Sequence, residues 1–311
     1  MAKPTDISNK RVNSRLMQVL KLVFVKGGIL PWFLLGAILI FTGASDSFLT
    51  NYNIMLIGRQ STYLVLVALG QMVALLTAGL DLSVGSIFAM TSVITATVMV
   101  AYLKIDPDAV WTTIFLGSLA GLAVGILIGM INGVGIAFFH VPPFIMTLAM
   151  STIVFGVALQ MTAGVPIYGM PQEFGEIFGY GLVGGIAVPT FFALGFCLIM
   201  YVILAWTKAG KYIYALGGNQ KAALLSGINT RKYLFLAYVV CGAITAMAAV
   251  LMTARLDSGE ANLGQNFPLQ SIAACVIGGV SLFGGIGGVV NVILGAIFII
   301  LVQNGMYLMK I

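Results

Sequence analysis

Long stretches without a charged residue constrain this chain more than any other feature. Only 8% of its 311 residues are charged, and one membrane crossing takes about 20 residues. The uncharged runs long enough for at least one crossing are 27–45, 60–80, 82–103, 109–172, 177–207, 233–254 and 261–309. A soluble domain cannot bury so much apolar chain, so we expect an all-α protein that crosses a membrane many times.

Two of these runs are long enough for two crossings. Val141-Pro142-Pro143 divides the run 109–172, and Gly284 to Gly288 divides the run 261–309, because proline and clustered glycine break a helix. This division predicts about nine crossings, or ten if both termini lie on the same side, at ~20 residues each. We expect some of these helices to be broken or re-entrant.

The distribution of charge predicts the orientation. Lys and Arg are retained on the cytoplasmic side of a membrane. With the N-terminus inside, 11 of the 15 basic residues fall there: Lys3, Lys10, Arg11, Arg15, Lys21, Lys26, Lys208, Lys211, Lys221, Arg231 and Lys232. Seven of the nine acids fall outside: Asp46, Asp106, Asp108, Glu173, Glu176, Asp257 and Glu260. We therefore expect a cytoplasmic basic tail at 1–28 and one transmembrane domain at 29–311.

An acid lies between two apolar runs in the stretch LTAGLDLSVGS, Leu76 to Ser86. A carboxylate near membrane depth is costly and usually marks function. Asp81 is expected either to cap a helix that starts at Leu82 or to act in a solute path or its gate. The two roles are compatible.

Six glycines occur within the eleven residues from Gly278 to Gly288. Such a segment cannot form a stable helix, and irregular backbone at membrane depth is tolerated only where protein or a cavity surrounds it. This predicts a place in the interior of the bundle. A tight re-entrant or cytoplasmic turn is the alternative.

A second glycine pattern lies earlier in the chain. Gly117, Gly121, Gly125, Gly129 and Gly133 repeat every four residues, which favours close helix packing within the bundle over a dimer face.

The loop at about 207–232 is the most polar long stretch in the interior of the chain. Asn219 is a good N-cap, Gln220 to Ser226 suit two helical turns, and Gly227 stands where a left-handed residue would end them. The apolar residues of this short helix are Ala222, Ala223, Leu224 and Leu225. A loop between spans has no reason to carry an apolar surface unless it docks on a partner, so we expect docking in the cytoplasm.

Several kinds of chemistry are missing from the sequence. There is no Gly-x-x-x-x-Gly-Lys-Ser/Thr loop, and a single histidine, His140, cannot make a metal cluster or a catalytic triad. The three cysteines lie inside apolar runs and indicate neither a disulfide framework nor a metal site. We therefore expect no catalysis, no cofactor and no metal. The basic balance follows from topology, so nucleic acid is not an expected partner.

At these stretches the chain resembles the permease subunits of bacterial ABC importers for ribose, xylose and galactose, which are related to the branched-chain amino-acid permeases. The matching segments, in family order, are Ala78 to Ser86, Asn132-Gly133, Pro142 to Ile145, Leu216 to Asn219, Ala222-Ala223, Ser226 to Ile228, Ile272 to Ala274, Ile277 to Gly279 and Ser281 to Gly285. They cover most of the chain, and the match is far more specific than any single glycine motif.

The resemblance implies a core of two permeases, identical or paralogous, in the bacterial inner membrane. It also implies cytoplasmic ATP-binding subunits and a periplasmic binding protein that delivers a sugar. It assigns the following residues to the loop that couples to the ATPase: Gly217, Gly218, Asn219, Ala222, Ala223, Leu225, Ser226, Gly227 and Ile228. The family usually has one further apolar segment and a charged tail after the position of Ile311. Either the natural protein continues or that segment is dispensable, and the family pattern favours the first.

A neutral sugar requires uncharged hydrogen-bonding groups along its path. The candidates for the path or its gate are Gln71, Asp81, Ser83, Asn132, Gln270, Ser281 and Asn304. For each one alone, an interhelical hydrogen bond is the competing role. Two other functions stay open: a secondary carrier that needs no ATPase, which the scarcity of charge at depth disfavours, and a membrane scaffold that transports nothing.

Overall fold

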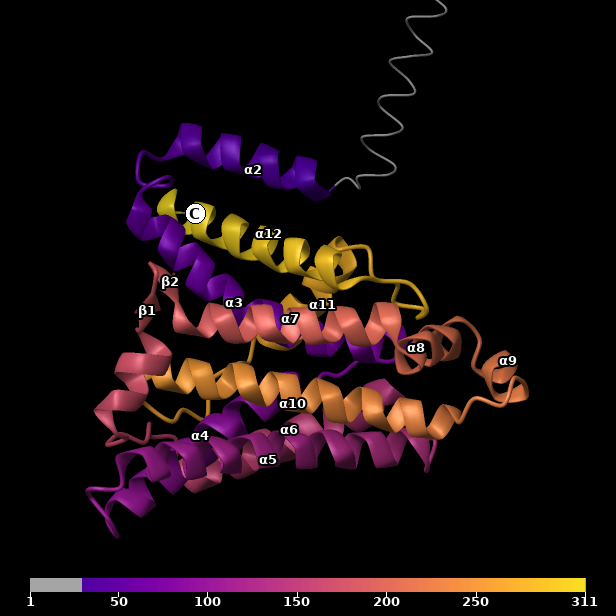
Figure 1. Cartoon of the computed structure of the whole chain (residues 1–311), viewed down its shortest axis with the longest axis horizontal. Helices are drawn as coiled ribbons and strands as arrows, with labels where there is room; N and C mark the ends of the chain where they lie inside the picture. Colours follow the sequence, from indigo (N-terminus) through magenta and orange to yellow (C-terminus); the bar gives the residue numbers. More distant parts are fainter. Residues whose placement is uncertain (1–29, 311) are drawn as a thin grey trace, which may run out of the picture.

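The chain is an almost entirely helical bundle in a computed structural model that describes residues 30–310 (Figure 1). The expected N-terminal tail, 1–28, lies outside the described residues. The helices are α2 (Leu30–Ala44), α3 (Asn51–Leu76), α4 (Val84–Leu103), α5 (Val110–Ala137), α6 (Pro143–Thr162), α7 (Val188–Trp206), α8 (Lys208–Gly218), α9 (Gln220–Leu225), α10 (Thr230–Leu256), α11 (Phe267–Ile277) and α12 (Val289–Leu308). A π-helix, η2 (Phe174–Gly179), precedes a small antiparallel hairpin of β1 (Leu182–Val183) and β2 (Ile186–Ala187).

Seven of the helices within residues 30–310 are long and apolar enough to cross a membrane: α3, α4, α5, α6, α7, α10 and α12. The expectation of an all-α polytopic protein is confirmed, but the count of nine to ten crossings is not. Each of the nine expected segments does contain an apolar helix. However, α2 has 15 residues and α11 has 11. At about 1.5 Å per residue, α11 spans roughly half of a ~30 Å hydrocarbon core.

The long helices run along one common direction, so their connections gather at two ends of the bundle (Figure 1). One end carries α8 and α9 and is called the α9 end here. The other carries the β1–β2 hairpin and the last residues of α12, and is called the hairpin end. The expected break at Pro142-Pro143 is confirmed, because α5 ends at Ala137 and α6 begins at Pro143.

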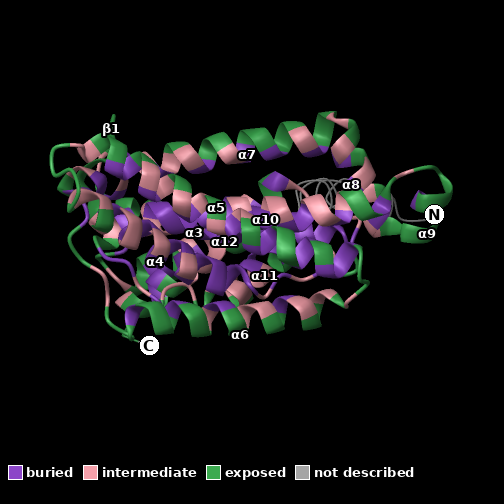
Figure 2. Cartoon of the chain, turned by 90° about the horizontal axis from the view of Figure 1, so that it is seen from below, coloured by how far each residue is buried: buried purple, intermediate pink, exposed green. Residues whose placement is uncertain are grey.

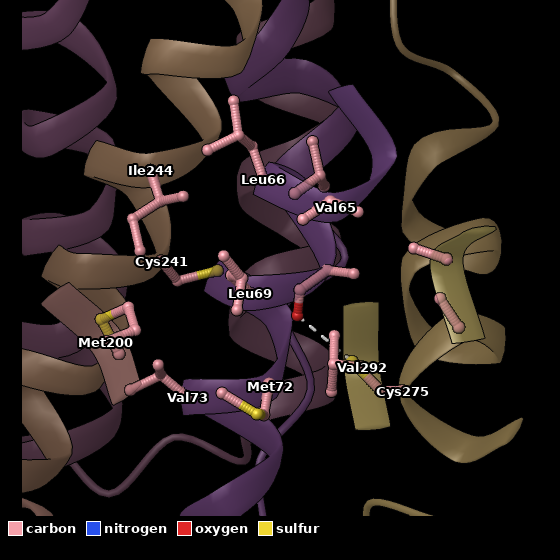
Figure 3. Packing of buried hydrophobic residues seen from close by; sticks show 14 of the residues in the cluster. Val65, Leu66, Leu69, Met72, Val73, Met200, Cys241, Ile244, Cys275 and Val292 are labelled. Atoms are coloured by element: carbon pink, nitrogen blue, oxygen red, sulfur yellow. Dashed lines mark hydrogen bonds between the residues drawn. The ribbon is translucent and has the colours of Figure 1, made fainter. Parts of the chain in front are cut away.

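The centre of the bundle is formed by α3 and α10. Every residue of α3 from Ser61 to Leu76 is buried, whereas the outer helices α6 and α7 carry many exposed residues (Figure 2). Leu66, Leu69 and Met72 of α3 pack with Cys241 of α10 (Figure 3). From α11, the Cys275 thiol donates to the Ala68 carbonyl at 3.2 Å. A helix that is apolar on all sides belongs in the middle of a membrane bundle.

The glycine repeat on α5 serves packing inside this chain. A Cβ atom at Gly129 would lie 2.5 Å from the carbonyl oxygen of Tyr238, and one at Gly133 would lie 2.8 Å from that of Phe235. Gly117 and Gly121 face α4 in the same way. Close backbone approach is the usual purpose of small residues between membrane helices. The packing interpretation is confirmed.

Candidate functional site

The chain reverses direction between α3 and α4 through residues 77–83, at the α9 side of the bundle. Ala78 has a left-handed φ of 60°, and the Ala78 and Gly79 amides donate back to the Leu75 and Ala74 carbonyls at 2.9 and 3.1 Å. The expected start of the next helix at Leu82 is wrong. α4 begins at Val84 with Ser83 at its N-cap position, so Asp81 lies in the turn before the helix.

The Asp81 side chain is fully buried and fixes this turn. Its Oδ1 atom accepts hydrogen bonds from the Ser83 amide at 2.9 Å and from the Ser83 hydroxyl at 2.6 Å. With the Gln71 amide of α3 oriented so that both of its polar atoms find partners, Nε2 donates to the Asp81 carbonyl at 3.0 Å and Oε1 accepts from the Asp81 amide at 3.2 Å. From α5, Asn132 Nδ2 donates to the Ser83 hydroxyl oxygen at 2.8 Å. Four of the sequence candidates therefore meet in one network.

A third helix, α6, holds the same turn through a residue that the sequence did not single out. The Thr147 hydroxyl of α6 accepts from the Leu82 amide at 3.1 Å. The same hydroxyl donates toward the carbonyl oxygens of Pro143 and Leu80, which lie 2.9 and 3.2 Å from its oxygen. A buried threonine one turn after Pro143 is the only sequence signal for this role.

The cluster retains hydrogen-bonding capacity. Asp81 Oδ2, Asn132 Oδ1 and the Tyr238 hydroxyl are buried and have no hydrogen-bond partner among residues 30–310. Buried polar atoms without partners are rare and usually carry a functional reason. No Lys or Arg of the described chain forms an ion pair with Asp81. The arrangement offers neutral donors and acceptors around one carboxyl group, as a path or gate for a neutral solute would.

The other three candidates lie elsewhere. Asn304 of α12 forms a reciprocal pair with Asn53 of α3, with amide distances of 2.9 and 2.8 Å. This pair is an interhelical hydrogen bond of the kind expected as the alternative to a path role. Ser281 lies in the glycine-rich segment, where its hydroxyl accepts from the Phe283 amide at 3.1 Å. Gln270 is partly exposed on α11.

The polar loop at the α9 end forms two helices. Asn219 caps α9, accepting from the Ala222 amide at 3.0 Å, and Gly227 follows with φ of 80°, so both expected caps are confirmed. The sequence interpretation missed α8. Thr207 caps that helix by accepting from the Gly210 amide at 3.3 Å. Gly217 and Gly218 therefore belong to a helix rather than to a loop.

The exposed surface of α9 is smaller than expected. Ala223 is buried against the rest of the chain, whereas Leu224 is 61% exposed and Leu225 is 89% exposed. A groove of about 590 Å³ separates α9 from the ends of α5 and α10. Its lining includes Ile136, His140, Lys221, Leu224, Ile228 and Arg231. The α9 end thus carries two exposed leucines, Leu224 and Leu225, beside basic side chains.

The glycine-rich segment lies at the α9 end rather than in the interior of the bundle. Residues 278–288 form no helix, as expected, but Phe283 at the tip is 89% exposed and Ile286 is 65% exposed. The expectation of an interior position is wrong, and the turn alternative describes the segment. The side chains at its tip face outward. The contacts that hold the segment are therefore made by its backbone.

Three stretches that are distant in sequence meet at this segment. The Gly285 amide donates to the Leu76 carbonyl at 3.0 Å. A Cβ atom at Gly217 would clash with that same carbonyl and lie 2.5 Å from the Gly285 nitrogen. One at Gly284 would lie 2.8 Å from the Gly217 oxygen and 2.9 Å from the Ala78 nitrogen. We call these contacts between 76–78, Gly217 and 284–285 the glycine junction.

A tyrosine of α8 adds a side-chain contact to the glycine junction. The Tyr214 hydroxyl donates to the Gly287 carbonyl at 2.8 Å, directly before α12 begins. Burial raises the pKa of Tyr214, which keeps the hydroxyl a neutral donor. No feature of the residues around Tyr214 predicts this contact.

The acidic stretch at the hairpin end has a compact structure. Glu173 directly precedes η2, Glu176 lies within it, and the β1–β2 hairpin follows. The Ile167 amide and carbonyl pair with those of Gly259 at 2.9 and 2.8 Å, which ties this stretch to the connection after α10.

Comparison with known proteins identifies the family. Residues 53–311 match the profile described as branched-chain amino acid transport system / permease component. The D-allose transport system permease protein of Escherichia coli is 35% identical over 86% of this chain and 79% of its own length. The ribose import permease protein of the same organism is 35% identical over 89% of this chain and 85% of its own. The galactose/methyl galactoside import permease protein is 34% identical over 92% and 88%.

No solved structure gives a significant match to the chain. The family match covers the Asp81 cluster, the glycine junction and both α8 and α9. The chain is therefore a multi-pass membrane protein that belongs to the branched-chain amino acid transport system permease family and serves as a permease component rather than an enzyme.

Proposed function

We propose that the chain is the permease subunit of an ATP-driven importer for a simple sugar, a pentose or a hexose. The names of three relatives, which transport allose, ribose and galactose, support a sugar as the solute. The polar cluster around Asp81 supports the same conclusion, because it offers neutral hydrogen-bonding groups and no ion pair. The chain forms the translocation path, and a separate subunit hydrolyses ATP.

The ATPase docks on α8 and α9. The observation that carries this step is α9 itself: a helix capped at both ends that carries Leu225 89% exposed. Exposed apolar side chains on a rigid helix suit a groove on a partner protein. The coupling residues are those of the sequence analysis: Gly217, Gly218, Asn219, Ala222, Ala223, Leu225, Ser226, Gly227 and Ile228. Gly217 acts through the chain's own backbone, and Leu225 acts through the partner.

The α9 end faces the cytoplasm of a bacterial cell, with the N-terminus on the same side of the inner membrane. Lys208, Lys211, Lys221, Arg231 and Lys232 support this orientation, since positive residues are retained inside. The hairpin end then faces the periplasm. There the acidic stretch around Glu173 and Glu176 receives a sugar-binding protein. A second permease, identical or paralogous, completes the core.

Asp81 acts as part of a lock on the path. Its network with Gln71, Ser83 and Asn132 joins α3, the 77–83 turn and α5, so movement of the turn must break these bonds together. ATP-driven closure of the partner subunits pushes α9 and rocks the permeases between outward- and inward-facing states, which is the usual form of alternating access.

Co-purification with the ATP-binding subunit encoded nearest its gene tests the proposal. We expect a complex with the natural chain and none after 217–228 is replaced by a Gly/Ser linker. A sharper variant is Leu224→Ser with Leu225→Ser, for which we expect at least a tenfold weaker complex. The matched control is Ile105→Ser, which removes an 80% exposed side chain at the hairpin end and should leave binding unchanged.

Each part of the proposal has an outcome that would contradict it. Equal binding by the leucine variants and by Ile105→Ser would remove α9 as the docking element. Gradient-driven solute flux by the chain alone in liposomes would favour a secondary carrier, whereas the absence of any solute uptake by the assembled complex would favour a scaffold. Charge reversal at Glu173 and Glu176 tests the periplasmic contact separately, and unchanged uptake would refute it.

A further inference from the structure

We infer that the glycine junction carries the displacement of the coupling helices to the Asp81 turn and to α12, with Gly217, Gly285 and Tyr214 as positioning residues. The inference rests on the proposed docking of the ATPase on α8 and α9. It adds the route inside the permease by which a push on those helices reaches the candidate path.

The contact at the junction is rigid. At the junction, backbone meets backbone: the Gly285 amide donates to the Leu76 carbonyl at 3.0 Å, and the α carbon of Gly217 faces that same carbonyl at a distance where a methyl group would clash. Side chains can change rotamer to absorb a small shift, but a contact between main chains cannot. A displacement of α8 must therefore move the end of α3 with it.

The second step is the short path from the junction to Asp81. Only four residues separate Leu76 from Asp81. Within them the Thr77, Ala78 and Gly79 amides bond back to α3 at 3.0, 2.9 and 3.1 Å. Gly79 fits against the Tyr238 ring of α10, where a Cβ atom would clash with the hydroxyl oxygen. The backbone of the turn is therefore held by hydrogen bonds and close packing. A movement of Leu76 must displace the turn as well.

The third step is the connection to α12. Tyr214 of α8 donates to the Gly287 carbonyl at 2.8 Å. The first helical residue of α12 is Val289. Displacement of α8 is thus communicated to two elements at once: the turn that holds Asp81 and the start of the last span. Energetic coupling between distant sites travels through such contiguous contacts.

Adjacent glycines provide a matched test. Gly217 and Gly218 both lie in α8, so replacing either by alanine changes helix propensity alike. A Cβ atom at Gly217 clashes with the Leu76 carbonyl, whereas one at Gly218 meets nothing within 4 Å. The complete transporter, with its ATPase and binding protein, is reconstituted in proteoliposomes with each variant, and sugar uptake is divided by ATP hydrolysed.

We expect Gly217→Ala to assemble with the ATPase and to hydrolyse ATP, but to import at least tenfold less sugar per ATP than Gly218→Ala. Equal ratios for the two variants would overturn the inference. Assembly of the natural chain with the ATPase is scored first, because it tests the proposed function rather than the junction.

A milder variant covers the case in which Gly217→Ala fails to fold. Tyr214→Phe removes only the hydroxyl that bonds Gly287. It should lower sugar imported per ATP about threefold while complex formation stays unchanged, and Tyr212→Phe on the same helix is its control. A merely structural role for Tyr214 would lower the yield of folded protein without changing the ratio, and that result would overturn the inference.

Discussion

Two breaks between helices lie on the same side of this bundle and are fixed in opposite ways. The turn at 77–83 is held by side chains, with Asp81, Gln71, Ser83, Asn132 and Thr147 in one hydrogen-bonded group. The segment at 278–288 turns Phe283 and Ile286 outward and is held through its main chain, at Gly284, at Gly285 and at the Gly287 carbonyl that accepts from Tyr214. A polar lock can open and close, whereas a backbone contact moves as a unit. The difference suits a gate in the first break and a connecting piece in the second.

The largest effect on stability is expected for a substitution at Asp81, in the first break. Asp81→Ala removes the acceptor of two buried hydrogen bonds and should lower the free energy of unfolding by about 3 kcal/mol. Thermal unfolding can be followed by a thiol-reactive dye, because Cys197, Cys241 and Cys275 are all buried. Asp108→Ala, at an exposed acid of the hairpin end, is the control. Equal shifts for the two variants would show that the turn does not depend on the carboxylate.

The backbone contact of the second break is tested by two glycines of the same segment. Gly284 and Gly279 have φ of 86° and 80°, so alanine is strained alike at both. Only at Gly284 would the new Cβ atom meet other segments, at 2.8 to 3.0 Å. We expect Gly284→Ala to destabilise the protein by about 2 kcal/mol more than Gly279→Ala in the same assay. Indistinguishable unfolding of the two variants would contradict a main-chain junction.

A single side chain of the first break should have a smaller effect. Thr147→Val leaves the Leu82 amide without its acceptor and should cost about 1 kcal/mol. Thr152→Val on the same helix is the control, because that exposed hydroxyl bonds only its own helix, at the Leu148 carbonyl. If the two variants unfold at the same temperature, α6 does not hold the turn.

The smallest effect is expected at the tip of the second break. Phe283→Ala removes a large side chain that is 89% exposed, and the free energy of unfolding should change by less than about 0.5 kcal/mol. A loss greater than that of Thr147→Val would mean that side chains hold this segment after all.

Features set by neighbouring residues could be predicted from the sequence. The Asn219 cap, the left-handed Gly227 and the break at Pro142-Pro143 all depend on a few adjacent residues, and each is found where expected. The α5 glycine repeat was also interpreted correctly, because its period alone places the glycines on one face.

Features that depend on spatial neighbours could not be predicted. Asn53 and Asn304 are 251 residues apart and form a hydrogen bond with each other. The residues around Asn304 do not reveal this partner, so the sequence alone could not separate Asn304 from the other path candidates. The glycine count correctly excluded a helix at 278–288, but the position of the segment depends on Leu76 and Gly217, which lie far away in sequence. The brevity of α11 was hidden for the same reason, since an uncharged run does not show where a helix within it ends.

The most direct test of the account is sugar uptake by proteoliposomes that contain the chain, its ATPase and its binding protein, with ribose, allose and galactose as probes. We expect accumulation of at least one of these sugars only when ATP and the ATPase are both present, and none with the chain alone under an ion gradient. Uptake by the chain alone, or the same uptake with and without ATP, would contradict it.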